Sequence, residues 1–347
     1  SERLATKGSL RAAALESLVS EDPSGAAGAA EFDLIARIRA RAARSSERGD
    51  VVLGIGDDAA LLRVPAGRLL VVATDTLNDG VHFPSDTAPF DLGWKSLAVN
   101  LSDLAAMGAE PAWATLSLSM RDANAAWLDG FLDGFLALAA QFGVALVGGD
   151  TTRGPLSVGV TVHGFVADGR GLRRGGAQVD DDVWVTGTLG DAAVALSQWR
   201  AGGAADPALR ARMDRPQPRI EAGRDLSVVA HAGIDVSDGL LADLGHVCAA
   251  SGVGARVDID ALPASDVLRA LMTEESRRLL QATGGDDYEL CFTAAPAQRV
   301  AIAAVAAKTG VATTRIGKIV AGSGVSAFDA RGGEWQAPRA GFDHFGG

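Results

Sequence analysis

Aspartates recur along the chain where an apolar run gives way to small turn residues. They are Asp57 and Asp58 in GIGDD, Asp75 in ATDTL, Asp150 in VGGD, and Asp235 and Asp238 in IDVSDG. Ligands of α/β proteins bind beyond the carboxyl ends of the strands, so we expect these side chains to converge on one cleft. One such motif alone is more typical of an ordinary turn, but their repetition favours a shared chemical role.

Converging carboxylates need a cation. Two bare carboxylates about 4 Å apart repel each other by roughly 4 kcal/mol at an effective dielectric constant of about 20, and a bound cation reverses that sign. No His or Cys cluster accompanies the aspartates, whereas Thr74 and Thr76 place hydroxyl oxygens beside Asp75. Oxygen ligands favour Mg²⁺, which completes its octahedron with water and nucleotide phosphates. The pattern therefore predicts magnesium-assisted phosphoryl chemistry.

A polar pair borders the apolar side of a helix expected over residues 91–107. Asn100 and Asp103 are spaced to share one helix face beside the stripe of Leu97, Leu101 and Leu104. Polar groups in such a position need partners. The local pattern supports a buried hydrogen-bond role as well as it supports metal ligation.

Glycine-rich turns provide candidate phosphate contacts. GIGDD, GGDTTRG and GGDDYEL let the backbone approach a ligand closely, and the sequence contains no P-loop of the type GxxxxGK[ST]. Arg153, Arg173 and Arg174 lie in such turns, although surface arginines are commonly only solvated. His82 follows the acidic loop in LNDGVHF, where an isolated histidine is usually incidental.

Composition excludes some partners. The chain has 347 residues, is 48% hydrophobic and carries a net charge of -11, so a nucleic-acid backbone is not an expected partner. No apolar run reaches membrane-spanning length, and we expect no membrane association. Cys248 and Cys291 form no CxxC pair and are expected to be buried thiols, which fits a cytoplasmic location.

Strand-like and helical segments alternate, which predicts an α/β protein of two domains. We expect a mobile N-terminal extension over residues 1–30, because that segment is rich in Ala, Ser and Gly. An amphipathic helix follows from Glu31, and LLVVATDTL is expected to form a buried strand. The first domain covers residues 31–168 and the second residues 169–347.

A series of segments along residues 31–345 resembles, in order, those of the thiamine-monophosphate kinases: GIGDDAALL, ATDTLNDGVHF, KSLAVNLSDLAAMGAEPAW, LVGGDTTRGPLS, VTGTLGD, IDVSDGLLADLGH, GGDDYELCFT and GFDHF. Aminoimidazole-ribonucleotide and selenophosphate synthetases share the fold and part of the carboxylate pattern. The resemblance implies an aminoimidazole-ribonucleotide synthetase-like α/β (α+β) fold. Its N-terminal sheet would pair across a homodimer, its C-terminal α/β layer domain would lie alongside, and ATP would bind between the domains.

The same resemblance implies roles for individual residues. Several Mg²⁺ ions would be held by Asp58, Thr74, Asp75, Asp103, Asp150, Asp235 and Asp238, of which Asp75, Asp150 and Asp238 would be catalytic. ATP would contact Gly149, Asp150, Arg174 and Ser237, and thiamine monophosphate would contact His82, Asp286 and Phe342. The sequence departs from the family at Asp286, where relatives often have Glu, and at Ala73, which replaces a Ser. Because Asp286 is shorter than Glu, its contact with the substrate could run through water or be made by Asp287 instead.

The implied reaction is ATP-dependent phosphorylation of thiamine monophosphate to thiamine diphosphate. The residues leave two alternatives open. One is a synthetase of the same superfamily that acts on an amide oxygen, and the other is a non-catalytic protein whose aspartates bind a cation or nucleotide and stabilise a dimer.

Overall fold

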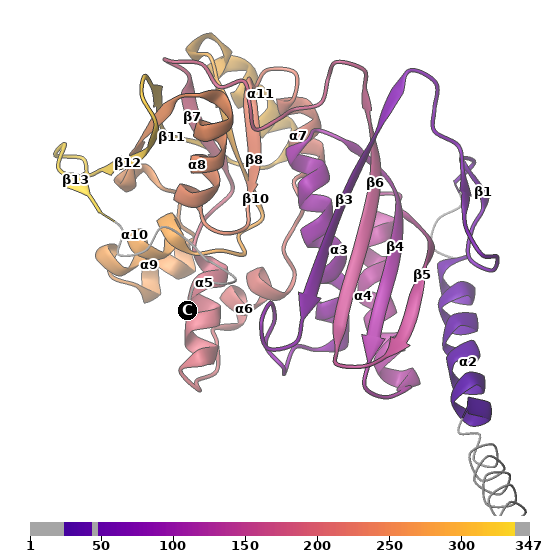
Figure 1. The fold of residues 1–347 in the computed structure, drawn as a ribbon. Coiled ribbons are helices and arrows are strands. Elements are labelled where there is room, and N and C mark those ends of the chain that lie inside the picture. The colour runs from indigo at the N-terminus through magenta and orange to yellow at the C-terminus, as the bar shows by residue number, and fades with distance from the viewer. Residues whose placement is uncertain (1–23, 44–47, 337–347) are drawn as a thin grey trace, which may run out of the picture.

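The N-terminal unit is a four-stranded sheet backed by two helices (Figure 1). The computed structural model describes residues 24–43 and 48–336. The elements of this unit are α2 (Ser24–Ala42), β1 (Val51–Leu53), β2 (Leu61–Leu62), β3 (Arg68–Asn78), α3 (Pro89–Ala106), β4 (Glu110–Met120), α4 (Ala125–Gln141), β5 (Ala145–Arg153) and β6 (Ser157–Ala167). The strand order is β3-β6-β4-β5, in which β4 and β5 are parallel and the other pairs are antiparallel.

The core of this unit lies between the sheet and α3 and α4. The stripe of Leu97, Leu101 and Leu104 on α3 is fully buried, as the helical spacing predicts. Gly93 on α3 lets the two helices approach closely, because a Cβ there would stand 1.9 Å from the carbonyl oxygen of Phe131 on α4. The opposite sheet face is partly covered by the β1–β2 hairpin, which packs around Trp113 and Phe165.

The C-terminal unit is a seven-stranded mixed sheet with helices around it. Its elements are β7 (Asp182–Thr186), α5 (Asp191–Arg200), α6 (Pro207–Asp214), α7 (Ile220–Leu226), β8 (Ala232–Val236), α8 (Leu240–Ser251), β9 (Gly254–Asp258), η1 (Ile259–Ala261), α9 (Asp266–Leu271), α10 (Glu274–Thr283), β10 (Glu289–Ala294), η2 (Pro296–Gln298), α11 (Arg299–Thr309), β11 (Thr313–Val320), β12 (Gly324–Phe328) and β13 (Glu334–Trp335). The strand order is β13-β12-β9-β11-β7-β10-β8.

Helix α3 forms much of the junction between the units, because it contacts α7, β8 and β10 as well as its own sheet. Gly223 on α7 lies so close to α3 that an added Cβ would stand 2.0 Å from the carbonyl oxygen of Ala105. The indole N–H of Trp94 on α3 donates to the carbonyl of Pro216, at 2.9 Å. Residues that face the second unit from α3 are therefore fixed relative to both cores.

The alternation of helices and strands confirms the predicted α/β class, but three local expectations were wrong. Helix α2 begins at Ser24 rather than Glu31, so the end of the segment expected to be a mobile extension is helical; residues 1–23 lie outside the described part. Strand β3 is an edge strand and largely exposed rather than buried. Asp75 and Asp150 lie within β3 and β5 rather than in turns, because ladder pairing with β6 and β4 continues past them.

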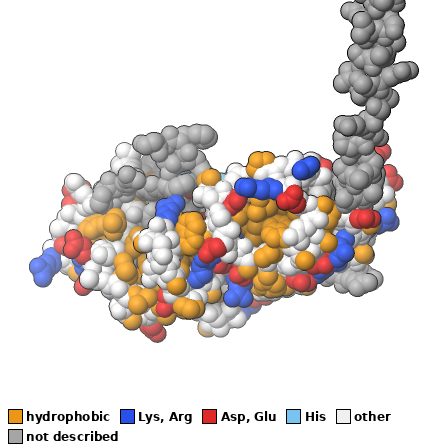
Figure 2. Space-filling model, turned by 90° about the horizontal axis from the view of Figure 1, so that it is seen from below, with side chains coloured by type: hydrophobic (Ala, Val, Ile, Leu, Met, Phe, Trp, Pro, Cys, Tyr) orange, Lys and Arg blue, Asp and Glu red, His pale blue; other side chains and the backbone are white. Residues whose placement is uncertain are grey.

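Charged side chains of both signs are interspersed over the face of the molecule seen in Figure 2, with apolar side chains between them. This distribution gives that face no continuous basic area of the kind that binds a nucleic-acid backbone. Across the described residues, no helix is both long and apolar enough to span a membrane.

Candidate active site

A cleft of about 830 Å³ is lined by both units. The N-terminal unit contributes β3, the following loop and α3, and the C-terminal unit contributes α5, α10, the segment before β10 and the turn after β8. The predicted site residues that line it are Asp75, His82, Asp103, Arg174, Asp235, Ser237, Asp238 and Asp286. Five aspartates from four separate segments of the chain thus face one space.

Asp235 and Asp238 are held by the end of β8 and its turn. The side chain of Asp235 is 5% exposed and accepts a hydrogen bond of 2.8 Å from the hydroxyl of Ser102 on α3. The turn itself is fixed by Asp243, whose Oδ2 accepts the backbone N–H groups of Ser237, Asp238 and Gly239 at 3.0–3.1 Å. Asp243 was not predicted, although its place early in helix α8 is where a carboxylate would complement backbone N–H groups.

Crowding of carboxylates disfavours their charged forms. Burial, together with the carboxylates of Asp235 and Asp75, raises the pKa of Asp103. Desolvation also raises the pKa of Asp75, and the charge of Asp238 adds to this rise. Burial raises the pKa of Asp243 to about 7. A cation bound in the cleft would therefore be stabilised by Asp75 and Asp103 and would favour their charged forms.

The donor set of the cleft fits Mg²⁺, since it consists of carboxylate oxygens whose mutual repulsion a cation relieves. Within residues 24–43 and 48–336, however, no three His, Cys, Asp or Glu side chains are placed as a ready metal site. Mg²⁺ commonly takes only one or two protein carboxylates and completes its shell with water and phosphate oxygens.

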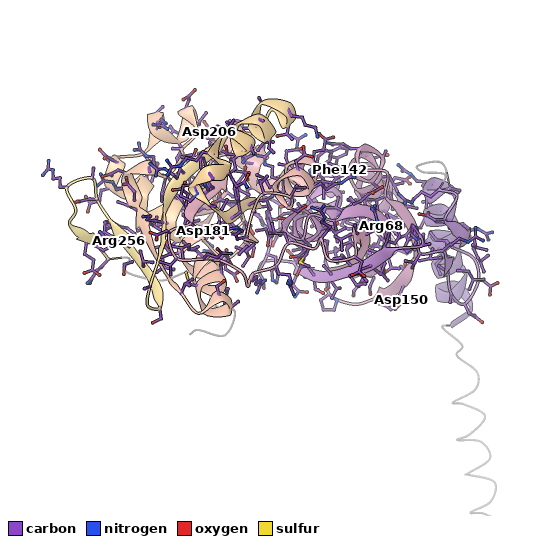
Figure 3. All side chains as sticks on the ribbon, turned by 90° about the horizontal axis from the view of Figure 1, so that it is seen from above. Arg68, Phe142, Asp150, Asp181, Asp206 and Arg256 are labelled. Carbon is purple, nitrogen blue, oxygen red and sulfur yellow. The ribbon has the colours of Figure 1, made fainter. Side chains whose placement is uncertain are left out.

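Another group of predicted residues lines a separate cavity of about 330 Å³ on the sheet. Thr74, Gly149 and Asp150 lie there among hydroxyl groups of β4 and β6, and Thr76 lines both this cavity and the cleft. Figure 3 shows Asp150 on the N-terminal unit, away from Asp181 and Asp206 of the C-terminal unit. Asp58 is exposed in the loop after β1 and lines neither space. Its participation and that of Asp150 in one common site stay predictions.

Gly149 has a steric reason to be glycine. Its φ is +148°, and a Cβ would stand 1.8 Å from the carbonyl oxygen of Leu116 on β4. The backbone of β5 can therefore approach β4 here only without a side chain, and this approach sets the position of Asp150. The predicted close approach of a ligand at Gly149 is not tested by this geometry.

Further candidates have partners within the protein. His82 accepts the backbone N–H of Asn78 at 3.0 Å through Nδ1, which fixes its ring at the cleft. Asn100 accepts the N–H of Asp75 at 2.8 Å, so it has the buried hydrogen-bond role. Arg153 bonds the carbonyl of Arg121. Arg153 and Arg173 do not line the cleft, whereas Arg174 does. Phe342 lies outside the described residues.

The segment before β10 anchors several walls of the cleft. Asp286 faces the cleft and forms an ion pair of 2.7 Å with Lys95 of α3, a residue that sequence reasoning missed. Asp287 is buried and accepts the N–H of Gly190 at the start of α5, so it is not available to replace Asp286 toward a ligand. Burial raises the pKa of Asp287 well above its usual range.

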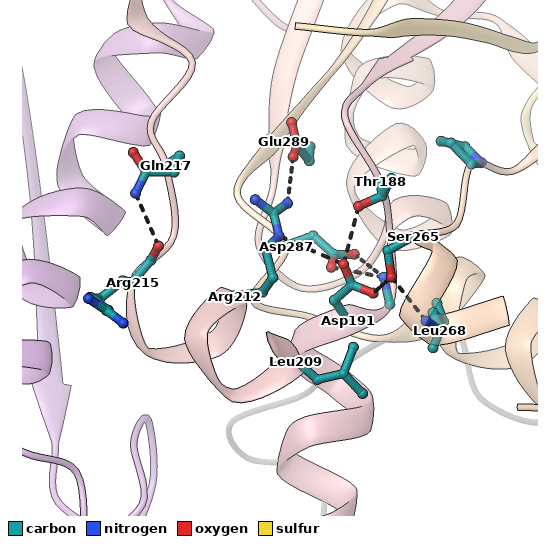
Figure 4. A network of polar contacts seen from close by, with 12 residues as sticks. Thr188, Asp191, Leu209, Arg212, Arg215, Gln217, Ser265, Leu268, Asp287 and Glu289 are labelled. Carbon is teal, nitrogen blue, oxygen red and sulfur yellow. Dashed lines mark hydrogen bonds and ion pairs between the residues drawn. The ribbon is translucent and has the colours of Figure 1, made fainter. Parts of the chain in front are cut away.

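Glu289 continues this anchoring without lining the cleft, and Figure 4 shows its contact with Arg212. Its fully buried carboxylate accepts two hydrogen bonds from Arg219, at 2.6 and 2.5 Å, and one from Arg212 on α6, at 2.8 Å. The hydroxyl of Thr186 on β7 adds a fourth at 2.7 Å. Gly187 makes room for the carboxylate, because a Cβ there would stand 2.1 Å from Glu289 Oε1.

Comparison with known families finds two matches in sequence order. Residues 56–166 match the N-terminal domain of AIR synthase related proteins, and residues 178–330 match their C-terminal domain.

Individual relatives match over nearly their full length. A thiamine-monophosphate kinase of Escherichia coli O157:H7 is 46% identical over 91% of this chain and 98% of its own, and one of Salmonella typhimurium is 45% identical over the same shares. The crystal structure of thiamine-monophosphate kinase from Stenotrophomonas maltophilia K279a has a TM-score of 0.81 and 55% identity, covering 88% of this chain and 98% of that one. The structure of AaThiL complexed with AMPPCP and TMP has a TM-score of 0.72 and 30% identity, covering 81% and 89%.

Proposed function

Because the chain belongs to the thiamine-monophosphate kinase family, we propose that it transfers the γ-phosphoryl group of ATP to thiamine monophosphate, giving thiamine diphosphate and ADP. The observation that carries the proposal is the cleft, where Asp75 and Asp103 of one unit face Asp235 and Asp238 of the other, beside Arg174. A related protein has been solved with AMPPCP and TMP together, which supports binding of both substrates by this fold.

The reaction we propose is direct in-line attack of a terminal phosphate oxygen of thiamine monophosphate on the γ-phosphorus of ATP. That oxygen is anionic near neutral pH, so the chain needs no strong general base. The protein's contribution is to hold two anions in line and to compensate their charge. Arg174 would donate to phosphate oxygens, while the turn fixed by Asp243 would keep Ser237 and Asp238 in place.

We assign metal binding to the acidic side chains. We propose that Asp75, Asp103, Asp235 and Asp238 hold Mg²⁺ in the cleft, and that Asp58, Thr74 and Asp150 take part when substrates are bound. Magnesium would supply charge neutralisation of the β- and γ-phosphates. ATP contacts are assigned to Gly149, Asp150, Arg174 and Ser237, contacts to the acceptor to His82, Asp286 and Phe342, and direct roles in catalysis to Asp75, Asp150 and Asp238.

Replacement of Asp75 by Asn tests the role of the carboxylates. Asp75→Asn removes a charge at nearly constant volume, so we expect loss of ADP release with thiamine monophosphate and an unchanged circular-dichroism spectrum. Asp122→Asn, at an exposed position outside the cleft, should keep wild-type turnover. Near-wild-type turnover of Asp75→Asn at saturating Mg²⁺ would contradict the assignment.

The wild-type protein tests the function itself in the same coupled assay. ADP release that depends on both Mg²⁺ and thiamine monophosphate is the expected result. ADP release only with an amide-containing acceptor would instead support a synthetase, and metal-dependent melting without any turnover would support a non-catalytic binding protein.

We also propose that the chain forms a homodimer through its N-terminal sheet. Val71 and Ala73 of β3 pack on the core beneath the sheet, so Leu70 and Val72 point to the opposite face. These two side chains are 44% and 54% exposed. Exposed apolar side chains on an edge strand are what a second copy of the sheet would cover.

A further inference from the structure

Lys95 is a buried lysine that joins the two units at the cleft. Its side chain is 1% exposed, and its Nζ lies 2.7 Å from Oδ2 of Asp286. An ammonium group so buried needs an opposite charge, since desolvation costs several kcal/mol. Lys95 belongs to α3 of the first unit and Asp286 to the second, so the pair is formed only when the units are docked.

Asp286 is held from more than one side. Its Oδ1 accepts the hydroxyl of Tyr288 at 3.1 Å, and its backbone N–H donates to the carbonyl of Ser237 at 2.9 Å. Asp286 and Tyr288 both have positive φ, +67° and +49°, a conformation that side-chain-bearing residues adopt only when their surroundings enforce it. The carboxylate is therefore fixed in one orientation at the cleft wall.

The pairing changes what this carboxylate offers to a ligand. A carboxylate has about four acceptor positions, and the two hydrogen bonds from Lys95 and Tyr288 leave acceptor capacity on the side lining the cleft. Its negative charge, by contrast, is compensated by an ammonium within hydrogen-bond distance. The field that a ligand meets is that of a dipole, which falls off faster than that of a bare charge.

We propose that Lys95 determines substrate specificity: it converts Asp286 from a free anion into a charge-compensated acceptor that recognises an uncharged N–H donor of the substrate. This inference rests on the proposed function. Thiamine monophosphate carries both kinds of group, a positively charged thiazolium ring and a neutral amino group on its pyrimidine ring. Asp286 would accept a hydrogen bond from the amino group, and its contribution to binding would depend little on the charge of the ring.

Substrate analogues separate the two modes of recognition. The probes are thiamine monophosphate, an analogue in which a neutral thiophene replaces the thiazolium, and an analogue in which an oxo group replaces the pyrimidine amino group. At saturating Mg²⁺, which in the proposed function neutralises the other carboxylates of the cleft, we expect the wild-type kcat/KM to differ by less than about threefold between the charged and neutral rings. The loss of the amino group should lower it by about tenfold or more, because a fixed acceptor then meets another acceptor.

Lys95→Met supplies the decisive comparison. It leaves Asp286 as an uncompensated anion, so we expect the preference for the charged over the neutral ring to increase by about tenfold. Lys95→Gln, which keeps a donor without the charge, should show the same increase. Lys308→Met is the control, because Lys308 is 71% exposed and pairs with Asp225 on the surface. This variant should keep the wild-type ratio of kcat/KM between the charged-ring and neutral-ring analogues.

Thermal melting of each variant checks that it is folded, and calorimetric Kd values for the same analogues replace kcat/KM for a variant with low turnover. If the ratio of kcat/KM for the charged-ring to the neutral-ring analogue is unchanged in folded Lys95→Met or Lys95→Gln, the inference is overturned. A strong preference of the wild type for the charged ring overturns it too. The proposed function is tested separately, because it is contradicted only if the wild type does not phosphorylate thiamine monophosphate at all.

Discussion

At the scale of single residues, glycines decide where buried carboxylates can lie. Gly187 has φ +58° and leaves space for Glu289, whose carboxylate collects hydrogen bonds from Arg212, Arg219 and Thr186. Any side chain at Gly187 would push this carboxylate out of its set of partners. The two arginines would then be left without their shared buried counter-ion.

Gly187→Ala tests this steric requirement against a matched control. Gly310 has a similar φ of +68° but nothing within 4 Å of an added Cβ, so Gly310→Ala should cost only the backbone strain, about 1 kcal/mol. Gly187→Ala should cost about 3 kcal/mol or more, because it also disrupts a buried ion pair. Urea unfolding measures both. Equal losses would show that Glu289 does not depend on the space at Gly187.

Asp182 gives a pH dependence of stability. Hydrogen bonds from Arg299, at 2.6 and 2.9 Å, hold its pKa below the usual 3.8, with a smaller contribution from Arg315. A depressed pKa of an acid stabilises the fold fully above pH 3.8, and this stabilisation is lost as the pH falls through the lower folded-state value. Asp182→Asn should therefore be less stable than the wild type at pH 7, with the gap closing below about pH 4. A gap independent of pH would contradict this.

The residues of the site could be predicted only in part. Asp75, Asp235 and Asp238 could be found because acidic residues bordering apolar runs indicate a ligand cleft, whereas Asp103 was assigned through the family resemblance; the structure brings these four to one space. Lys95 and Glu289 carry no such local signal, and Asp243 is indicated only by its place early in helix α8. Each acts through a partner distant in the chain or through backbone N–H groups, which only the folded arrangement identifies.

At the scale of elements, helices were the more predictable part. The period of Leu97, Leu101 and Leu104 predicted α3 to within a few residues at each end. The exposure of β3 could not be predicted, because LLVVATDTL has the composition of a buried strand, and its place at the sheet edge depends on which strands pair. The early start of α2 was missed because residues 24–30 are mostly Ala and Gly, without an apolar period.

Helix α2 illustrates which contacts attach an element. It packs against β5 and α4, with Leu34 and Ile38 buried and Arg37 paired with Asp129 at the surface. Ile38→Ala should lower the unfolding free energy by about 2 kcal/mol, whereas Arg37→Ala should lower it by less than about 1 kcal/mol. Denaturant unfolding checks the order. A larger loss for Arg37→Ala would mean that the surface ion pair, not the apolar contact, attaches α2.

At the scale of the whole molecule, the sheet face that bears Val72 would be buried in the proposed dimer. Val72→Lys should shift the protein from dimer to monomer, because a lysine placed opposite its own copy would repel it. Val300→Lys is the control, since Val300 on α11 is 83% exposed and far from the sheet in the chain. Light scattering during size-exclusion chromatography gives the mass. A monomeric wild type, or an unaffected Val72→Lys, would contradict the proposed interface.

The division of the cleft between two units also has a consequence for how the chain folds and unfolds. Asp75 and Asp103 come from one unit and Asp235 and Asp238 from the other, and α3 contributes to the first unit's core while touching β8 and β10 of the second. A chain with only one unit formed would have two of these four aspartates and only part of the lining of the cleft. Nucleotide would then bind only to the chain in which both units are folded and docked, and would stabilise that state. In its presence the two units would therefore unfold together in a single cooperative transition.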